Sequence, residues 1–111
     1  MASDSGSDEL FRMLADPTRR RILDLLAEHG SLTVGELAAE FPGLVSSGIS
    51  KHLMALRAAG LVSAAREGRH RRYALDAGAF GAALGPWLAR YEPFFAEALD
   101  RLRALAESED R

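Results

Sequence analysis

The hydrophobic period of this chain changes at Gly60, and no other feature constrains the fold as much. In the preceding stretch, VSSGISKHLMALRAAG, the apolar residues Ile49, Leu53 and Leu56 are spaced i, i+4 and i+7. This spacing predicts a helix over 46–59 with one buried face. In the following stretch, LVSAAREGRHRRYAL, apolar and polar residues alternate. A helix followed directly by strands is therefore expected.

The alternating stretch predicts a β-hairpin over 61–75. Its turn signal is Glu67-Gly68, because glycine is common where a tight turn requires a positive φ. A two-residue loop at this position would set Arg66 directly opposite Arg69. Like charges opposed in this way destabilise a strand pair, which favours an anionic partner for the hairpin.

Two further helices are predicted near the N-terminus. The shorter one covers 8–14. The longer one covers 17–29 in ADPTRRRILDLLAEHG, where Asp16 is a suitable cap, Pro17 suits the first helical position and Gly30 suits the exit.

A third helix is predicted over 32–41, LTVGELAAEF, with Thr33 as its cap. The predicted order is two helices, a short turn, another helix and then a basic hairpin. This is the winged helix-turn-helix plan. The expected fold class is therefore mainly α with a small β-hairpin.

Length and composition limit the class of protein further. A chain of 111 residues fits one domain, and no apolar run approaches the roughly 20 residues of a membrane span. The start, MASDSGSDEL, lacks the basic and apolar regions of a secretory signal. Cysteine is absent, which removes disulfides, thiolate metal sites and cysteine nucleophiles. A cytoplasmic protein without a membrane partner is expected.

Charge is distributed unevenly although the net charge is only −2. Residues 1–16 carry one basic and four acidic side chains, a net charge of −3. Residues 76–111 carry four basic and seven acidic side chains, also a net charge of −3. Residues 17–75 carry nine basic and five acidic side chains, a net of +4, densest over 66–72. This asymmetry predicts an anionic partner for the middle of the chain.

Duplex DNA is the anionic partner that fits this plan. Ser46 or Ser47 is expected to cap the helix over 46–59, whose outward face would enter the major groove. The chain contains no Asn or Gln, so base reading falls to serine and lysine, with Lys51 to guanine the strongest candidate. The predicted DNA-binding residues are Ser46, Ser47, Ser50, Lys51, His52, Arg57, Arg66, Arg69, His70 and Arg71.

The sequence resembles the ArsR/SmtB-type winged-helix repressors. The resemblance is carried by LADPTRRRILDLL, LTVGELAAEF, SGISKHLMALRAAGLV and REGRHRRYAL, which together cover most of residues 10–75. It implies that the helix over 46–59 reads the major groove and that the wing over 61–75 reaches phosphate or the minor groove. It also implies a homodimer formed by the first and last helices, and a repressor that leaves a palindromic operator when a signal arrives.

The metal positions familiar from this family hold residues that do not bind metal. The thiolate motif would fall on Thr33 and Gly35, and the motif of the C-terminal helix on Ala77, Ala79, Arg90 and Pro93. The three histidines lie on separate predicted elements without ligand spacing. We therefore expect no metal and no cofactor, and the resemblance is to a metal-independent branch.

The tail PWLARYEPFFAEALDRLRAL is similar to the aromatic-rich C-terminal helix of that branch. Pro86 and Pro93 interrupt it, which predicts a short helix before 85 and a bent one after it. The expected dimer interface comprises Leu10, Phe11, Leu14, Trp87, Leu88, Tyr91, Phe94, Phe95, Leu99 and Leu102. The expected organisation is a disordered tail over 1–7, the DNA-binding domain with its N-terminal dimerisation helix over 8–76, a helical dimerisation segment over 77–107 and a tail over 108–111.

Other functions remain open at this point. One is a repressor that senses a metal or a small molecule at an unfamiliar effector site, and another is a winged helix that binds only proteins. An enzyme is not expected, because the chain has no phosphate-binding glycine loop, no HExxH and no plausible nucleophile–base spacing.

Overall fold

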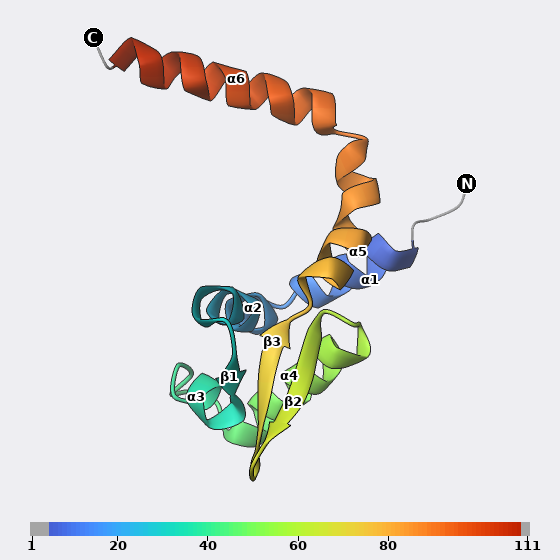
Figure 1. Ribbon diagram of the computed structural model, residues 1–111, viewed down its shortest axis with the longest axis vertical. Helices are drawn as coiled ribbons and strands as arrows, with labels where there is room; N and C mark the ends of the chain where they lie inside the picture. The colour runs from blue at the N-terminus through green and yellow to red at the C-terminus, as the bar shows by residue number, and fades with distance from the viewer. Residues whose placement is uncertain (1–4, 110–111) are drawn as a thin grey trace.

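The computed structural model describes residues 5–109 and is mainly helical, with a three-stranded antiparallel sheet (Figure 1). The expected fold class, a winged helix-turn-helix, is confirmed. The sheet has the strand order β1-β3-β2. The elements are α1 (Ser5–Leu14), α2 (Pro17–His29), β1 (Leu32–Thr33), α3 (Val34–Ala38), α4 (Ser46–Ala58), β2 (Val62–Glu67), β3 (His70–Leu75), α5 (Ala77–Ala89) and α6 (Glu92–Glu109).

The core lies between helices α1 to α4 and one face of the sheet. As the spacing predicts, Ile49, Leu53 and Leu56 of α4 are fully buried. They pack with the buried apolar side chains of the other elements, which are Leu10, Met13, Ile22, Leu23, Leu25, Leu26, Leu37, Leu61, Val62 and Tyr73. This core fixes α4 by one face and leaves its other face to solvent.

Helix α2 begins and ends at the predicted signals. Asp16 Oδ1 accepts a hydrogen bond from the Thr18 backbone N–H at 2.8 Å, and Pro17 occupies the first helical position. Gly30 takes a φ of +85° and donates its N–H to the Leu26 carbonyl at 2.9 Å. A side chain is disfavoured at that φ, so glycine is suited to this exit.

The helix predicted over 32–41 is wrong at both ends. Leu32 and Thr33 form the strand β1, paired with Tyr73 and Arg72 of β3, and α3 ends at Ala38. Thr33 caps α3 as expected, with its hydroxyl accepting from the Glu36 N–H at 3.2 Å. A cap residue has extended backbone, which lets the same two residues pair with the distant β3.

The hairpin is present, but its turn lies one residue later than predicted. Glu67 pairs with His70, so the loop is Gly68-Arg69, and Arg66 lies opposite Arg71 rather than Arg69. Gly68 has a φ of +62°. A two-residue loop can take its positive φ at the first central position, where glycine is preferred, and this sets the register.

The expected disordered tail over 1–7 and the expected tail over 108–111 are wrong where the structure can test them. Helix α1 begins at Ser5, and Ser7 is buried at 2% exposure, so 5–7 belong to the fold. Helix α6 continues to Glu109, through two residues of the tail expected over 108–111. Residues 1–4 and 110–111 lie outside the described residues.

The predicted helix end before 85 is also wrong, since Pro86 lies within α5. The chain turns at 90–91 instead, where the N–H groups of Arg90 and Tyr91 bond to carbonyls three residues back. Pro93 then lies in the first turn of α6, where its missing N–H costs nothing. Helix α6 therefore projects from the body of the protein (Figure 1).

In the part of the chain that the structure describes, no helix has both the length and the apolar content needed to cross a membrane.

Candidate nucleic-acid interface

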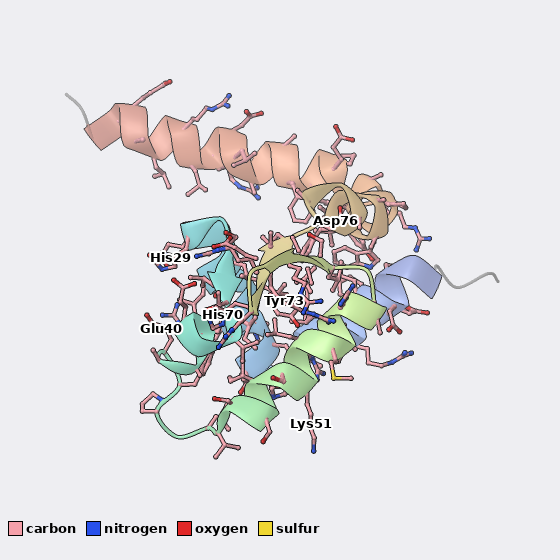
Figure 2. All side chains as sticks on the ribbon, turned by 60° about the horizontal axis from the view of Figure 1, so that its bottom comes forward. His29, Glu40, Lys51, His70, Tyr73 and Asp76 are labelled. Carbon is pink, nitrogen blue, oxygen red and sulfur yellow. The ribbon has the colours of Figure 1, made fainter. Side chains whose placement is uncertain are left out.

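The outward face of α4 carries the predicted base-reading residues. Ser46, Ser47 and Lys51 are exposed, and Ser50 is half-buried. Lys51 points away from the rest of the protein (Figure 2). Arg57, six residues after Lys51 or about 1.7 turns further along the helix, is exposed. The structure therefore brings these polar groups onto one accessible side.

The start of α4 differs from the prediction that Ser46 or Ser47 caps the helix. The cap position is Val45, which makes no side-chain hydrogen bond to the first turn. Ser46 and Ser47 are instead the first two helical residues. Their hydroxyls are left for solvent or for a partner.

The wing presents two arginines side by side. Arg66 and Arg71 are paired across β2 and β3, and alternation places Arg71 on the same face as Tyr73. Tyr73 is buried in the core, whereas both arginines lie beyond the core and are exposed. Arg69 and His70, at the tip, are exposed too. Across the residues that the structure describes, no carboxylate pairs with Arg66, Arg69 or Arg71.

Arg72 lies on the opposite face of β3 and has a different role. Its Nε is 2.8 Å from Glu67 Oε2, and its Nη1 is 3.4 Å from both Glu36 Oε1 and the Ser31 carbonyl. The side chain thus connects the wing to the start of α3. The Thr33 backbone N–H, helped by the charge of Arg72, holds the pKa of Glu36 below its ordinary value.

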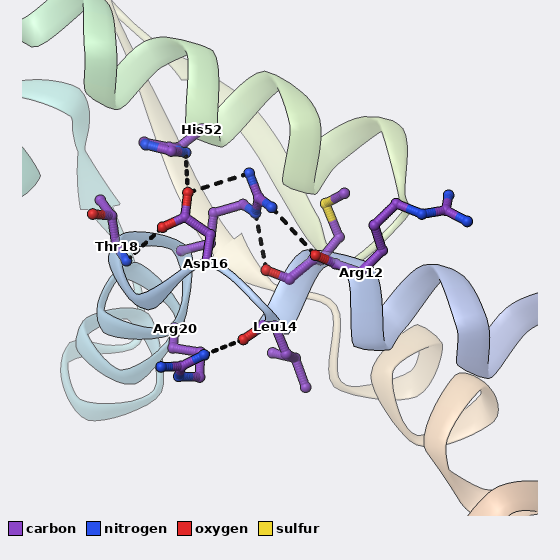
Figure 3. A network of polar contacts seen from close by, with 8 residues as sticks. Arg12, Leu14, Asp16, Thr18, Arg20 and His52 are labelled. Carbon is purple, nitrogen blue, oxygen red and sulfur yellow. Dashed lines mark hydrogen bonds and ion pairs between the residues drawn. The ribbon is translucent and has the colours of Figure 1, made fainter.

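His52, predicted to bind DNA, points inward toward Asp16 (Figure 3). Its Nδ1 lies 3.6 Å from Asp16 Oδ2, and the side chain is 24% exposed. The same carboxylate oxygen lies 3.5 Å from Arg19 Nη1, while Arg19 Nε donates to the Met13 carbonyl at 2.9 Å. Asp16 and Arg19 thus help to position α4, a role that hydrophobic spacing does not reveal.

The predicted interface residues at the two ends of the chain divide into three groups. Leu10 is 1% exposed and belongs to the core of this chain, so it offers no surface to a partner. Phe11, Leu14, Trp87 and Leu88 are half-buried, and the rings of Phe11 in α1 and Trp87 in α5 are 5.0 Å apart. The exposed members are Tyr91, Phe94, Phe95, Leu99 and Leu102.

Comparison with known proteins identifies the family to which this arrangement of elements belongs. The helix-turn-helix domain family matches residues 14–63. The HTH-type transcriptional regulator CmtR of Mycobacterium tuberculosis is 49% identical over 82 residues, which cover 74% of this chain and 68% of CmtR. The crystal structure of the ArsR family transcriptional regulator RHA00566 aligns with a TM-score of 0.70 at 32% identity, covering 86% of this chain and 95% of that one.

The chain belongs to the ArsR family of winged helix-turn-helix transcriptional regulators. It is accordingly a DNA-binding regulator. Two further matches have names that state a function. The transcriptional repressor SdpR of Bacillus subtilis is 39% identical over 69 residues, covering 62% of this chain and 74% of SdpR. The NMR structure of CmtR, described as a cadmium metal-sensor, aligns with a TM-score of 0.55 at 48% identity, covering 71% of this chain and 80% of CmtR.

Two of the positions that the resemblance names for metal ligands, Thr33 and Gly35, lie at the start of α3. Thr33 uses its hydroxyl to cap α3, and Gly35 has no side chain. Within 5–109, no three His, Asp or Glu side chains gather closely enough to hold a metal ion.

Proposed function

We propose that this ArsR-family chain is a homodimeric repressor without catalytic activity, which acts in the cytoplasm on a palindromic operator of its own or a neighbouring operon. Helix α4 would read the major groove, and the wing would bind phosphate or the minor groove. One observation carries the proposal: the start of α4 and the tip of the β2–β3 hairpin lie at the same end of the molecule (Figure 1). A duplex laid across this end can contact both.

The charge of this end supports DNA as the partner. The end carries Lys51 and the arginines Arg66, Arg69 and Arg71, none of which is neutralised by a carboxylate within the described chain. When unpaired cations of this kind bind phosphates, they release the counterions that had gathered around the DNA. The affinity for DNA should therefore fall steeply as the salt concentration rises. A winged helix that binds only proteins would not need them.

The test is binding of the purified protein to the DNA upstream of its own coding sequence, across a salt series. Tight binding to a palindromic site that weakens steeply with salt is expected. A shuffled duplex of equal length and composition is the control. Equal affinity for both duplexes would contradict a sequence-specific regulator.

Dimerisation is supported by the apolar face of α6. Phe94, Leu99 and Leu102 are 55–67% exposed, although they recur at helical spacing. A groove of about 480 Å³ lies in the angle between α5 and α6, lined by Leu88, Phe95 and other mainly apolar residues. A second copy of the chain can cover both surfaces with matching ones, as two-fold interfaces do. Sedimentation at micromolar concentration should give twice the monomer mass of 12.0 kDa.

We propose further that the repressor does not respond to metal through the positions familiar in its family. CmtR is named a cadmium sensor, but this chain contains no cysteine, and thiolates are the ligands that soft metal ions prefer. Cadmium or zinc titrated into the protein–DNA complex should leave it intact. Release of DNA by either ion at a stoichiometric concentration would instead favour a repressor that senses metal at an unfamiliar effector site.

A further inference from the structure

We propose that Val45 and Met54 are specificity residues that read the C5-methyl groups of thymines in the major groove. The inference rests on the proposed function, in which α4 is the reading helix, and it names a contact that the polar residues of α4 cannot make.

Exposure singles out these two side chains. Among the described residues, the exposed large hydrophobic side chains form two groups, one from Tyr91 onward and one around α4. The second group includes Val45 at 71% and Met54 at 68% exposure. The first group belongs to the proposed dimer surface. The second lies far from it along the chain, with Val45 directly before Ser46 and Met54 within α4.

Val45 also occupies a position that its side chain serves poorly. It is the N-cap of α4, where Ser, Thr, Asp and Asn are preferred and valine is among the least favourable residues. Threonine has nearly the same shape and would supply the missing cap. A residue that breaks a local rule without a structural gain in the free protein is expected at a functional position.

The geometry of α4 places Met54 on the reading side. Met54 follows Lys51 by three residues and Ser47 by seven, so all three share the exposed face, away from the buried stripe of α4. Val45 precedes Met54 by nine residues, about 13.5 Å along a helix axis. The two apolar side chains therefore meet different base pairs.

The chemistry of the groove identifies the ligand group. The C5-methyl of thymine is the apolar group that a base pair offers there, and apolar side chains are its natural partners. The chain has no Asn or Gln, the residues that bond adenine in a bidentate way. An A·T pair is thus recognised from its thymine side.

Deoxyuridine provides the test, because it lacks only the C5-methyl. The full-length protein first selects a duplex from a random pool, and each thymine of the selected site is then replaced in turn by deoxyuridine. Replacement at one or more positions should weaken binding of the wild-type protein about three- to fivefold, as expected for one methyl group buried. In Val45→Ala or Met54→Ala, deoxyuridine in place of the thymine that the altered residue contacts should no longer weaken binding.

Val45→Thr is the matched control, since it keeps one methyl and adds a capping hydroxyl. It should retain part of the discrimination between thymine and deoxyuridine and should not unfold. If the pool yields no enriched sequence, the proposed function fails. If a sequence is enriched but no replacement weakens binding, or both alanine variants discriminate as the wild type does, only the present inference is overturned.

Discussion

Asp16 Oδ2 lies 3.6 Å from His52 Nδ1, so the carboxylate that caps α2 also contacts α4 (Figure 3). Its other oxygen accepts the Thr18 N–H, and Arg19 connects the same carboxylate to the end of α1. One acidic side chain therefore links three helices. The reading helix owes its position to this contact as well as to the core.

Replacing Asp16 should destabilise the whole domain. Asp16→Ala removes a cap and the contacts to Arg19 and His52, and we expect the free energy of unfolding to fall by about 1–2 kcal/mol. Urea unfolding monitored by circular dichroism measures it. Asp24→Ala, which removes an exposed acid from the same helix, is the control and should stay within about 0.5 kcal/mol of wild type. Equal losses in both variants would contradict the role given to Asp16.

The capping box of α3 predicts an acid-sensitive contribution to stability. The pKa of Glu36 lies below its ordinary value of 4.5, mainly because its carboxylate accepts the Thr33 backbone N–H. Since the pKa is lowered on folding, the contribution is complete above the unfolded pKa and is lost as the pH falls through the folded one. The free energies of unfolding of wild type and Glu36→Gln should therefore differ most near neutral pH, and the difference should disappear as the pH falls below the folded pKa of Glu36. A constant difference would rule out this titration.

Much of this fold could be predicted because its signals are local. Asp16, Pro17 and Gly30 fix α2 through rules that involve only a few neighbouring residues, and the spacing of Ile49 and Leu53 defines the buried face of α4. Both features occur in the structure as expected.

The errors occur where distant parts of the chain meet. Leu32 becomes a strand because it pairs with Tyr73, 41 positions later, and no local pattern announces that pairing. His52 lies on the correct helix but turns toward Asp16 of α2. The hairpin register depended on one backbone angle at Gly68, and a shift by one residue changed the partner of Arg66. Helix positions were thus easier to predict than strand register and the directions of individual side chains.

Replacing each of two adjacent arginines in β3 should separate an effect on DNA binding from an effect on stability. Arg71→Ala removes an exposed cation, so affinity for all duplexes should fall and the slope of log K against log salt should decrease by about 1. The free energy of unfolding should not change. Arg72→Ala instead removes the contacts to Glu67, Glu36 and Ser31. It should lower the free energy of unfolding by about 1 kcal/mol. If only Arg72→Ala reduced the slope of log K against log salt, Arg72 rather than Arg71 would be the residue that binds phosphate.

Lys51 should affect base preference as well as affinity. Lys51→Ala should weaken binding to the operator by about 1–3 kcal/mol and abolish discrimination at one G·C pair, since lysine can bond the O6 and N7 of guanine. Competition with operators that carry single G·C substitutions measures this. Arg103→Ala removes an equal charge from α6 and should keep the base preference. Unchanged affinity and preference in Lys51→Ala would exclude α4 as the reading helix.

The exposed face of α6 should control assembly. Leu102 is 62% exposed and belongs to the apolar face of α6, whereas Ala104 lies on the opposite side of the same helix. Leu102→Glu places a charge in the proposed interface, and we expect the dimer dissociation constant to rise at least about 100-fold, as for a buried charge without a partner. Ala104→Glu adds the same charge outside the interface and should sediment as wild type. Because Leu102 packs little in the single chain, both variants should keep the helical circular dichroism of the wild type. A wild-type protein that sediments as a monomer would contradict the proposed homodimer. A Leu102→Glu dimer of undiminished affinity would place the interface elsewhere.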